Sequence, residues 1–79
     1  MDDWEDALEA IDSLVGMIDD LEESHERTYE RGLEFFEDVR EKAVSMSETI
    51  TEREEVTERQ SEAIAGWTAG VQKWHPDYK

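Results

Sequence analysis

Apolar side chains recur every three or four residues along the first half of the chain, which is the period of one face of an α-helix. Gly16 and Gly32 are the glycines in this half, which contains no proline, and the stripe thins around residues 22–27. The pattern predicts a long N-terminal helix over about residues 3–48, continuous but with any bend placed near 22–32. The stripe consists of Trp4, Leu8, Ile11, Val15, Ile18, Tyr29, Phe36, Val39, Ala43, Met46 and Ile50.

A second helix is predicted after a polar segment. Residues 45–56 hold two serines and two threonines, and the apolar spacing fails after Ile50, which favours a turn. Thr57-x-x-Gln60 then has the form of a capping box, and it stands directly before a clean apolar stripe. Pro76 disfavours helix in the residue before it. We therefore predict a shorter C-terminal helix over about residues 57–74.

The two predicted helices differ in length, and this difference determines the expected architecture. A straight helix of about 45 residues is about 68 Å long, and the C-terminal helix covers about 27 Å of it. Either two chains pair as a homodimer of helical hairpins, or one chain bends into a three-helix bundle; we favour the dimer. In both cases the fold is all-α, with residues 1–79 as a single domain and 76–79 as a flexible tail. The apolar interface left bare on a straight helix is Trp4, Leu8, Ile11, Val15 and Ile18.

The net charge of the chain says more about its function than any motif does. The chain carries 23 Asp and Glu against 8 Lys and Arg, a formal net charge of −15 in 79 residues. Residues 1–30 hold 12 of the acids and a single Lys or Arg, Arg27. Such a density of like charge destabilises a compact domain through self-repulsion, and the missing lysines leave few i,i+4 ion pairs to relieve it. A basic partner is the favoured explanation, and adaptation to high salt is the chief alternative.

The acids also recur at helical spacing beside the apolar stripe. Carboxylates three or four residues apart on a helix are about 5–6 Å from one another, which is not far from the spacing of phosphates along a nucleic-acid strand. A rigid acidic helix can therefore occupy a basic nucleic-acid channel as a DNA mimic. The residues expected to act as phosphate surrogates are Glu5, Glu9, Asp12, Asp19, Asp20, Glu23, Glu26 and Glu30.

A metal site is a weaker alternative. Glu22-x-x-His25 has the spacing of the Glu-x-x-His pairs of ferritin-like di-iron proteins, and it resembles the short ferritin-like proteins that complete their site by dimerising. Glu26, Glu30 or Glu62 would supply a further carboxylate. The chain holds 15 glutamates, so a chance match is common. We expect no metal and no cofactor, and we keep a ferritin-like protein as an alternative.

Other chemistry has little support. The chain has no cysteine, no Ser/His/Asp set, no glycine-rich phosphate loop and no zinc spacing, so we do not expect an enzyme. Trp67 and Trp74 lie seven residues apart and are expected in the core, because Arg59, Lys73 and Lys79 are too few cations for a base-stacking surface. No apolar run approaches the roughly 18 residues that span a bilayer. We expect a cytoplasmic protein that binds neither nucleic acid nor membrane directly.

The stretch from Phe36 to Trp74 resembles a helical module of small phage and prophage proteins. Its pattern is Phe36-x-x-Val39-Arg40-Glu41-Lys42, followed by Thr57-x-x-Gln60-x-x-Ala63-Ile64-x-x-Trp67-x-x-Gly70-Val71-x-Lys73-Trp74. The acidic character also resembles phage-encoded anti-defence proteins, including anti-CRISPR and anti-restriction inhibitors. The resemblance implies an inhibitor of a host CRISPR effector, restriction enzyme or other DNA-processing protein, and it carries over no residue roles. A small structural or adaptor protein from a high-salt habitat is the remaining alternative.

Overall fold

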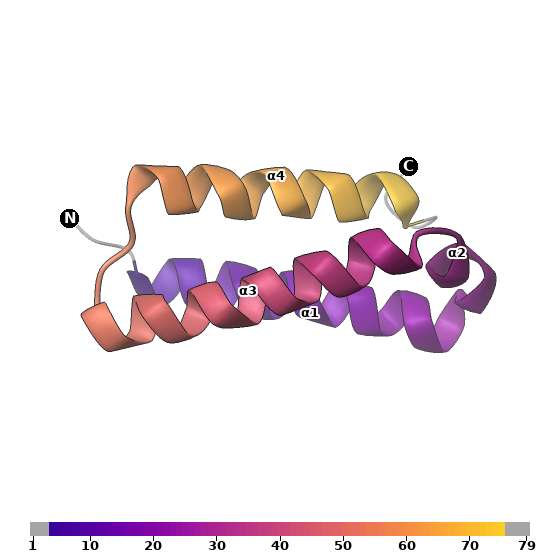
Figure 1. Cartoon of the computed structure of the whole chain (residues 1–79), viewed down its shortest axis with the longest axis horizontal. Coiled ribbons are helices and arrows are strands. Elements are labelled where there is room, and N and C mark those ends of the chain that lie inside the picture. Colours follow the sequence, from indigo (N-terminus) through magenta and orange to yellow (C-terminus); the bar gives the residue numbers. More distant parts are fainter. Residues whose placement is uncertain (1–3, 76–79) are drawn as a thin grey trace.

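The computed structural model describes residues 4–75, which form the helices α1 (Trp4–Ser24), α2 (Glu26–Arg31), α3 (Leu33–Arg53) and α4 (Glu58–Trp74). No strand occurs in this range. The three long helices lie side by side around one core, and the short α2 joins α1 to α3 at one end of the bundle (Figure 1). The fold is therefore all-α, as predicted, and takes the three-helix form. The predicted tail at 76–79 lies outside the described residues.

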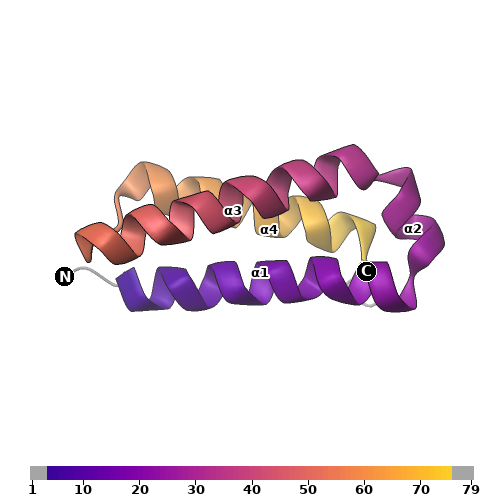
Figure 2. The ribbon, with the colours of Figure 1, turned by 60° about the horizontal axis from the view of Figure 1, so that its bottom comes forward.

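The chain reverses direction between α1 and α3 instead of continuing as one helix. His25 stands between α1 and α2 with φ −135° and ψ 53°, and Gly32 stands between α2 and α3 with φ −111° and ψ 22°. Figure 2 shows the consequence, with α3 and α4 lying above α1. The prediction of a continuous helix is wrong at these two residues, whereas the bend placed near 22–32 is confirmed. A bent chain removes more apolar surface from water than a straight one does.

Folding back covers the apolar stripe of α1. Ile11 and Ile18 are buried in the core of this chain, at 3% and 0% exposure. Their predicted place on a bare interface is wrong, because the bend brings α3 and α4 over the surface that a straight helix leaves in water. Trp4, Leu8 and Val15 are partly buried and pack against the core, so their contact with a partner stays a prediction.

An aromatic cluster closes the core at the α2 end. Phe36 is fully buried, and its ring stacks on Tyr29 with the centroids 5.5 Å apart. Phe35 and Trp74 meet the same ring edge-on at 5.6 and 5.7 Å. The cluster therefore joins α2, α3 and α4. Trp74 and Trp67 both pack against the core, which confirms their predicted role.

The turn between α3 and α4 is shorter than predicted. The helix α3 continues to Arg53, past its expected end near residue 48. Its serine and threonine residues are helical, and their hydroxyls bond to carbonyls of the same helix without ending it: the Ser47 hydroxyl donates to the Val44 carbonyl at 2.7 Å. Glu54 then ends the helix in the left-handed conformation, with φ 52°.

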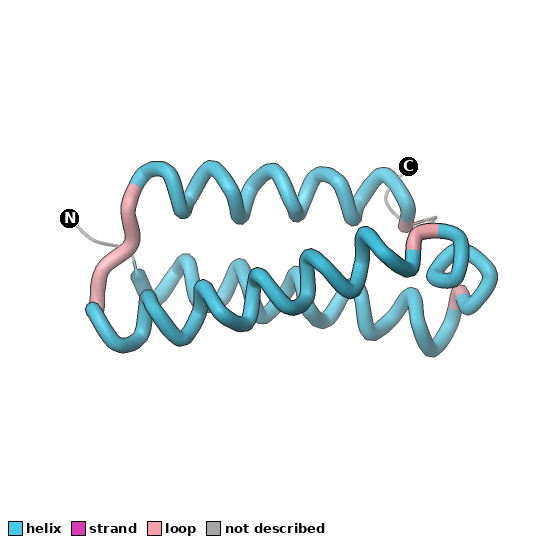
Figure 3. Tube along the Cα trace, in the orientation of Figure 1, coloured by secondary structure: helices cyan, strands magenta, loops and turns pink. Residues whose placement is uncertain are grey.

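The start of α4 follows its sequence signature. Thr57 accepts a hydrogen bond from the Gln60 backbone N–H, and its own backbone N–H donates to the Gln60 side chain. This is the predicted capping box, and it begins α4 at Glu58 directly after the loop that Figure 3 shows between α3 and α4. None of the helices within residues 4–75 is long and apolar enough to cross a bilayer.

Two glycine substitutions should have opposite effects on stability. Gly16→Ala should raise the free energy of unfolding by about 0.5–1 kcal/mol, because alanine favours a helix interior and a Cβ at this position meets no atom within 4 Å. Gly32→Ala should lower it by about 1–2 kcal/mol, because a Cβ there would lie 2.8 Å from Phe36 Cε2 and 3.3 Å from Trp74 Cε2. Urea unfolding measures both, and equal shifts would contradict the packing at the α2 end.

The left-handed residue at the end of α3 provides a second test. Glu54→Gly should raise the free energy of unfolding by about 0.5–1 kcal/mol, because a non-glycine residue in this conformation costs about 1–2 kcal/mol and the greater freedom of unfolded glycine offsets part of the gain. Glu52→Gly removes the same charge from inside α3 and should lower stability by about 1 kcal/mol. Thermal unfolding distinguishes the two variants, and a loss of stability in both would refute the conformational argument.

Candidate functional site

Two histidines and an aspartate meet where α1, α2 and α4 come together. Asp20 lies near the end of α1, His25 directly precedes α2, and His75 directly follows α4. Each residue offers one possible ligand atom, and these atoms all lie within 4.8 Å of one another. His75 is buried, with 3% of its surface exposed, whereas His25 is half-buried and Asp20 is exposed. The cluster thus joins positions that are far apart in the sequence.

The backbone sets the positions of both histidines. The His75 N–H donates to the Val71 carbonyl, and the His25 N–H donates to the Leu21 carbonyl. The Nε2 atom of His75 lies 2.7 Å from Asp20 Oδ2, which is a hydrogen-bonding distance. The two imidazole rings meet edge-on, with centroids 5.2 Å apart. The cluster is therefore held by helix ends that the core itself positions.

The predicted Glu22–His25 pair is not a ligand pair in this structure. The helix α1 ends at Ser24, so His25 does not keep the i,i+3 register that brings two side chains onto one face. Glu22 instead contacts Arg40, with Oε1 3.3 Å from Nη2. Within the described residues, the potential ligands grouped with His25 are Asp20 and His75. Glu26, Glu30 and Glu62, the further carboxylates considered from the sequence, do not belong to that group.

His75 is a candidate site residue that the sequence analysis does not single out. It directly precedes Pro76, and the sequence pattern uses this position only to mark the end of the C-terminal helix. A signal was nevertheless available, because the chain contains two histidines and each stands next to a helix end. His25, between α1 and α2, meets His75, at the end of α4, only because the chain reverses. The two histidines can therefore be recognised as one cluster only once the three-helix topology is known.

Arg40 connects α3 to α1. Its Nη2 atom lies 2.6 Å from Asp19 Oδ1 in addition to the Glu22 contact. Burial lowers the pKa of Arg40, whereas Tyr29, Asp19 and Glu22 raise it, and the net shift is upward. The Nε atom of Arg40 is buried without a hydrogen-bond partner. This guanidinium therefore neutralises two acids of α1 through its outer end.

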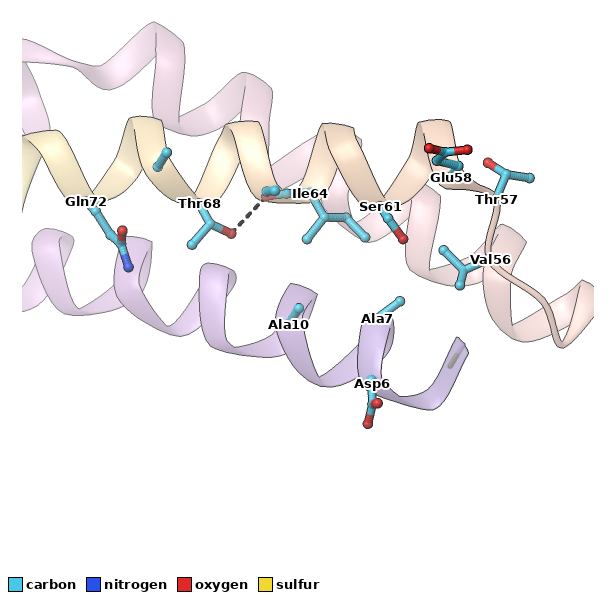
Figure 4. Close-up of a pocket in the computed structure, with 12 residues that line it drawn as sticks. Asp6, Ala7, Ala10, Val56, Thr57, Glu58, Ser61, Ile64, Thr68 and Gln72 are labelled. Atoms are coloured by element: carbon cyan, nitrogen blue, oxygen red, sulfur yellow. Dashed lines mark hydrogen bonds between the residues drawn. The ribbon is translucent and has the colours of Figure 1, made fainter. Parts of the chain in front are cut away.

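A groove runs between α1 and α4 toward the histidine cluster. Its wider part has a volume of about 610 Å³ and is lined largely by small residues. Figure 4 shows Ser61, Thr68 and Gln72 directed from α4 toward α1, whereas Asp6 points away. A further hollow of about 450 Å³ shares Thr68 and Gln72 with this groove and is also lined by Asp20 and His75. The cluster is therefore reached from solvent along the α1–α4 groove.

Four of the predicted partner-binding acids lie on the outward side of α1. Glu5, Glu9, Asp12 and Glu23 are exposed and recur at three-, four- and eleven-residue spacings, which keeps them opposite the buried side of the helix. None of the four forms an ion pair within residues 4–75. We refer to these four residues as the outward acidic face.

The other four predicted acids are exposed but differ in their surroundings. Asp19 and Asp20 contact side chains of this chain, as described above. Glu26 and Glu30 lie on α2, which carries as many arginines as glutamates and does not continue the axis of α1 (Figure 2). The eight predicted residues therefore do not form one uniform surface.

Replacement of Arg40 should destabilise the bundle more than replacement of an ordinary surface lysine. Arg40→Met should lower the free energy of unfolding by about 1–2 kcal/mol, because it removes two ion pairs and leaves Asp19 close to Glu22. Lys42→Met also removes one positive charge, but its pair with Asp38 is exposed at both ends (59% and 56%), and its effect should stay within about 0.5 kcal/mol. Urea unfolding at low salt and at 1 M NaCl should show the difference shrinking with salt. Equal losses for both variants would contradict a bridging role for Arg40.

The comparisons with known proteins add no functional assignment to this geometry. Neither protein families, nor curated proteins, nor solved structures gave a match to the chain.

Proposed function

We propose that this protein is an inhibitory binding protein whose outward acidic face occupies the basic nucleic-acid channel of a partner. The observation that carries the proposal is the charge of α1, which holds eight acids and no Lys, Arg or His in 21 residues. At a rise of about 1.5 Å per residue, this is one carboxylate per roughly 4 Å of helix axis when all sides of α1 are counted, and the outward acidic face carries four of the eight. A single nucleic-acid strand carries one phosphate per about 3.4 Å.

The distribution of charge among the helices supports a partner-binding face. The helices α2 and α4 each carry two acids and two bases, and α3 carries six acids and three bases. Adaptation to high salt acts on solvated surface in general, so it gives no reason for α1 alone to lack bases. A partner that recognises one side of the molecule does give such a reason.

The rigidity of α1 supports the same proposal. Leu14, Ile18 and Leu21 on its inner side are fully buried, so the outward carboxylates stand on a helix held in place along its length. A preorganised set of charges loses less conformational freedom on binding than a flexible acidic segment does. Complementary charge also accelerates association, and this acceleration weakens as salt is added.

The partner class follows from the charge and from the resemblance noted in the sequence. We propose a cytoplasmic basic protein that binds nucleic acid, with a host CRISPR effector, restriction enzyme or other DNA-processing factor as the specific targets. Direct binding to nucleic acid is not expected, because both surfaces are negative. A structural or adaptor protein of a high-salt habitat is the second candidate, favoured by the acid excess of α3.

The proposal predicts that charge on α1 matters more than equal charge elsewhere. Tagged protein is used to capture partners from host lysate at about 100 mM salt, and the affinity for the recovered partner is then measured with purified components. Replacing the outward acidic face with Gln and Asn (Glu5→Gln, Glu9→Gln, Asp12→Asn and Glu23→Gln) should weaken binding about a hundredfold, since each exposed charge pair contributes up to about 1 kcal/mol. Added DNA should displace the partner.

The matched control neutralises four exposed acids of α3, with Glu34, Glu37, Glu41 and Glu48 each changed to Gln. It changes the net charge by the same amount and should reduce affinity less than tenfold. Equal effects of the two quadruple variants, or a partner that DNA does not displace, would refute the mimic. Folding that requires molar salt in both variants and in the wild type would support the high-salt alternative instead.

A further inference from the structure

We propose that Asp20, His25 and His75 bind one divalent transition-metal ion at the junction of α1, α2 and α4. The inference is independent of the acidic face, and it departs from the sequence expectation of no metal. Two imidazoles and one carboxylate are a donor set that zinc proteins use when three protein ligands leave a fourth position open, and the same set binds iron in other sites. Imidazole nitrogen favours such ions over Mg²⁺ and Ca²⁺, which prefer oxygen ligands.

The distances within the cluster suit a shared ion. Zinc bonds of about 2.0–2.1 Å at tetrahedral angles place two ligand atoms about 3.3 Å apart. The Nε2 of His75 and Oδ2 of Asp20 are 2.7 Å apart, and the ligand atoms of all three residues lie within 4.8 Å. The contact between His75 and Asp20 shows that these two atoms already face each other. A metal ion can therefore replace the direct contact between these two atoms after a small side-chain movement.

The surroundings allow that movement while keeping the site defined. His75 is buried and fixed by the end of α4, whereas Asp20 is exposed and His25 is half-buried, so these two side chains have room to adjust. The hollow lined by Asp20 and His75 gives an ion a path from solvent. The negative charge of α1 raises the local concentration of cations near this path.

A bound ion would connect segments that are separated in the sequence. His25 and His75 stand at opposite ends of the segment that contains α2, α3 and α4. The ligands come together only in the folded chain, so metal binding stabilises the fold by mass action. This gives the proposal a readout that does not depend on any activity.

The test uses the full chain, freed of metal with a chelator and titrated with ZnCl₂ in 150 mM NaCl and 5 mM MgCl₂. Calorimetry should show one zinc per chain, and Tm should rise by about 10 °C or more when free zinc is a hundred times the Kd. Titration with CoCl₂ should produce visible absorption bands of a low-coordinate nitrogen and oxygen site. The excess Mg²⁺ occupies surface carboxylates, so binding that Mg²⁺ abolishes would overturn the proposal.

Three variants test whether zinc binds at this cluster or to the acidic side chains of α1 in general. His25→Ala and Asp20→Asn should each weaken zinc binding about a hundredfold and remove most of the Tm rise, and circular dichroism checks that both remain folded. Asp12→Asn removes the same charge from the outward face of α1 and should leave the affinity unchanged. Equal affinities in Asp12→Asn, Asp20→Asn and His25→Ala would overturn the assignment.

Discussion

Burial of the inner side of α1 is the constraint on which the other features depend, because this helix packs against both α3 and α4. Ile11, Leu14, Ile18 and Leu21 are all nearly inaccessible to solvent. A straight N-terminal helix would leave the same residues in water, so the chain reverses at His25 and Gly32. That reversal forms the aromatic cluster around Phe36 and also brings the end of α4 against the end of α1.

The acids of α1 therefore fall into two groups with different surroundings. The acids of the outward acidic face are exposed and form no ion pair within residues 4–75. Asp19, Asp20 and Glu22 lie at the edges of the buried side, where Arg40 and His75 contact them. One helix thus carries exposed acids with no ion pair within residues 4–75 on one side and acids that contact Arg40 and His75 on another.

The features that the sequence predicted well are those decided by local interactions. The capping box of Thr57 and Gln60 needs only four residues, and it is found where the pattern placed it. The break at His25 has only a weak local signal, the thinning of the apolar stripe at residues 22–27, because the segment contains no glycine, proline or asparagine. Burial of residues far away in the sequence decides it. The histidine cluster follows from that break, so it could not be predicted while the helix was taken as continuous. The polar end of α3 was read as a turn because serine and threonine hydroxyls can bond either to a turn or to the helix backbone.

The separation of α1 into a packed side and a solvated side has a consequence for how the protein can change over time. The side chains of Glu5, Glu9, Asp12 and Glu23 are exposed, so substitutions that change the charge of this face are expected to disturb the bundle little. Substitutions at Asp20, His25 or His75 act on a junction of three helices and are less free. Divergent relatives of this chain should therefore differ most on the outer surface of α1 and least where the helix ends meet.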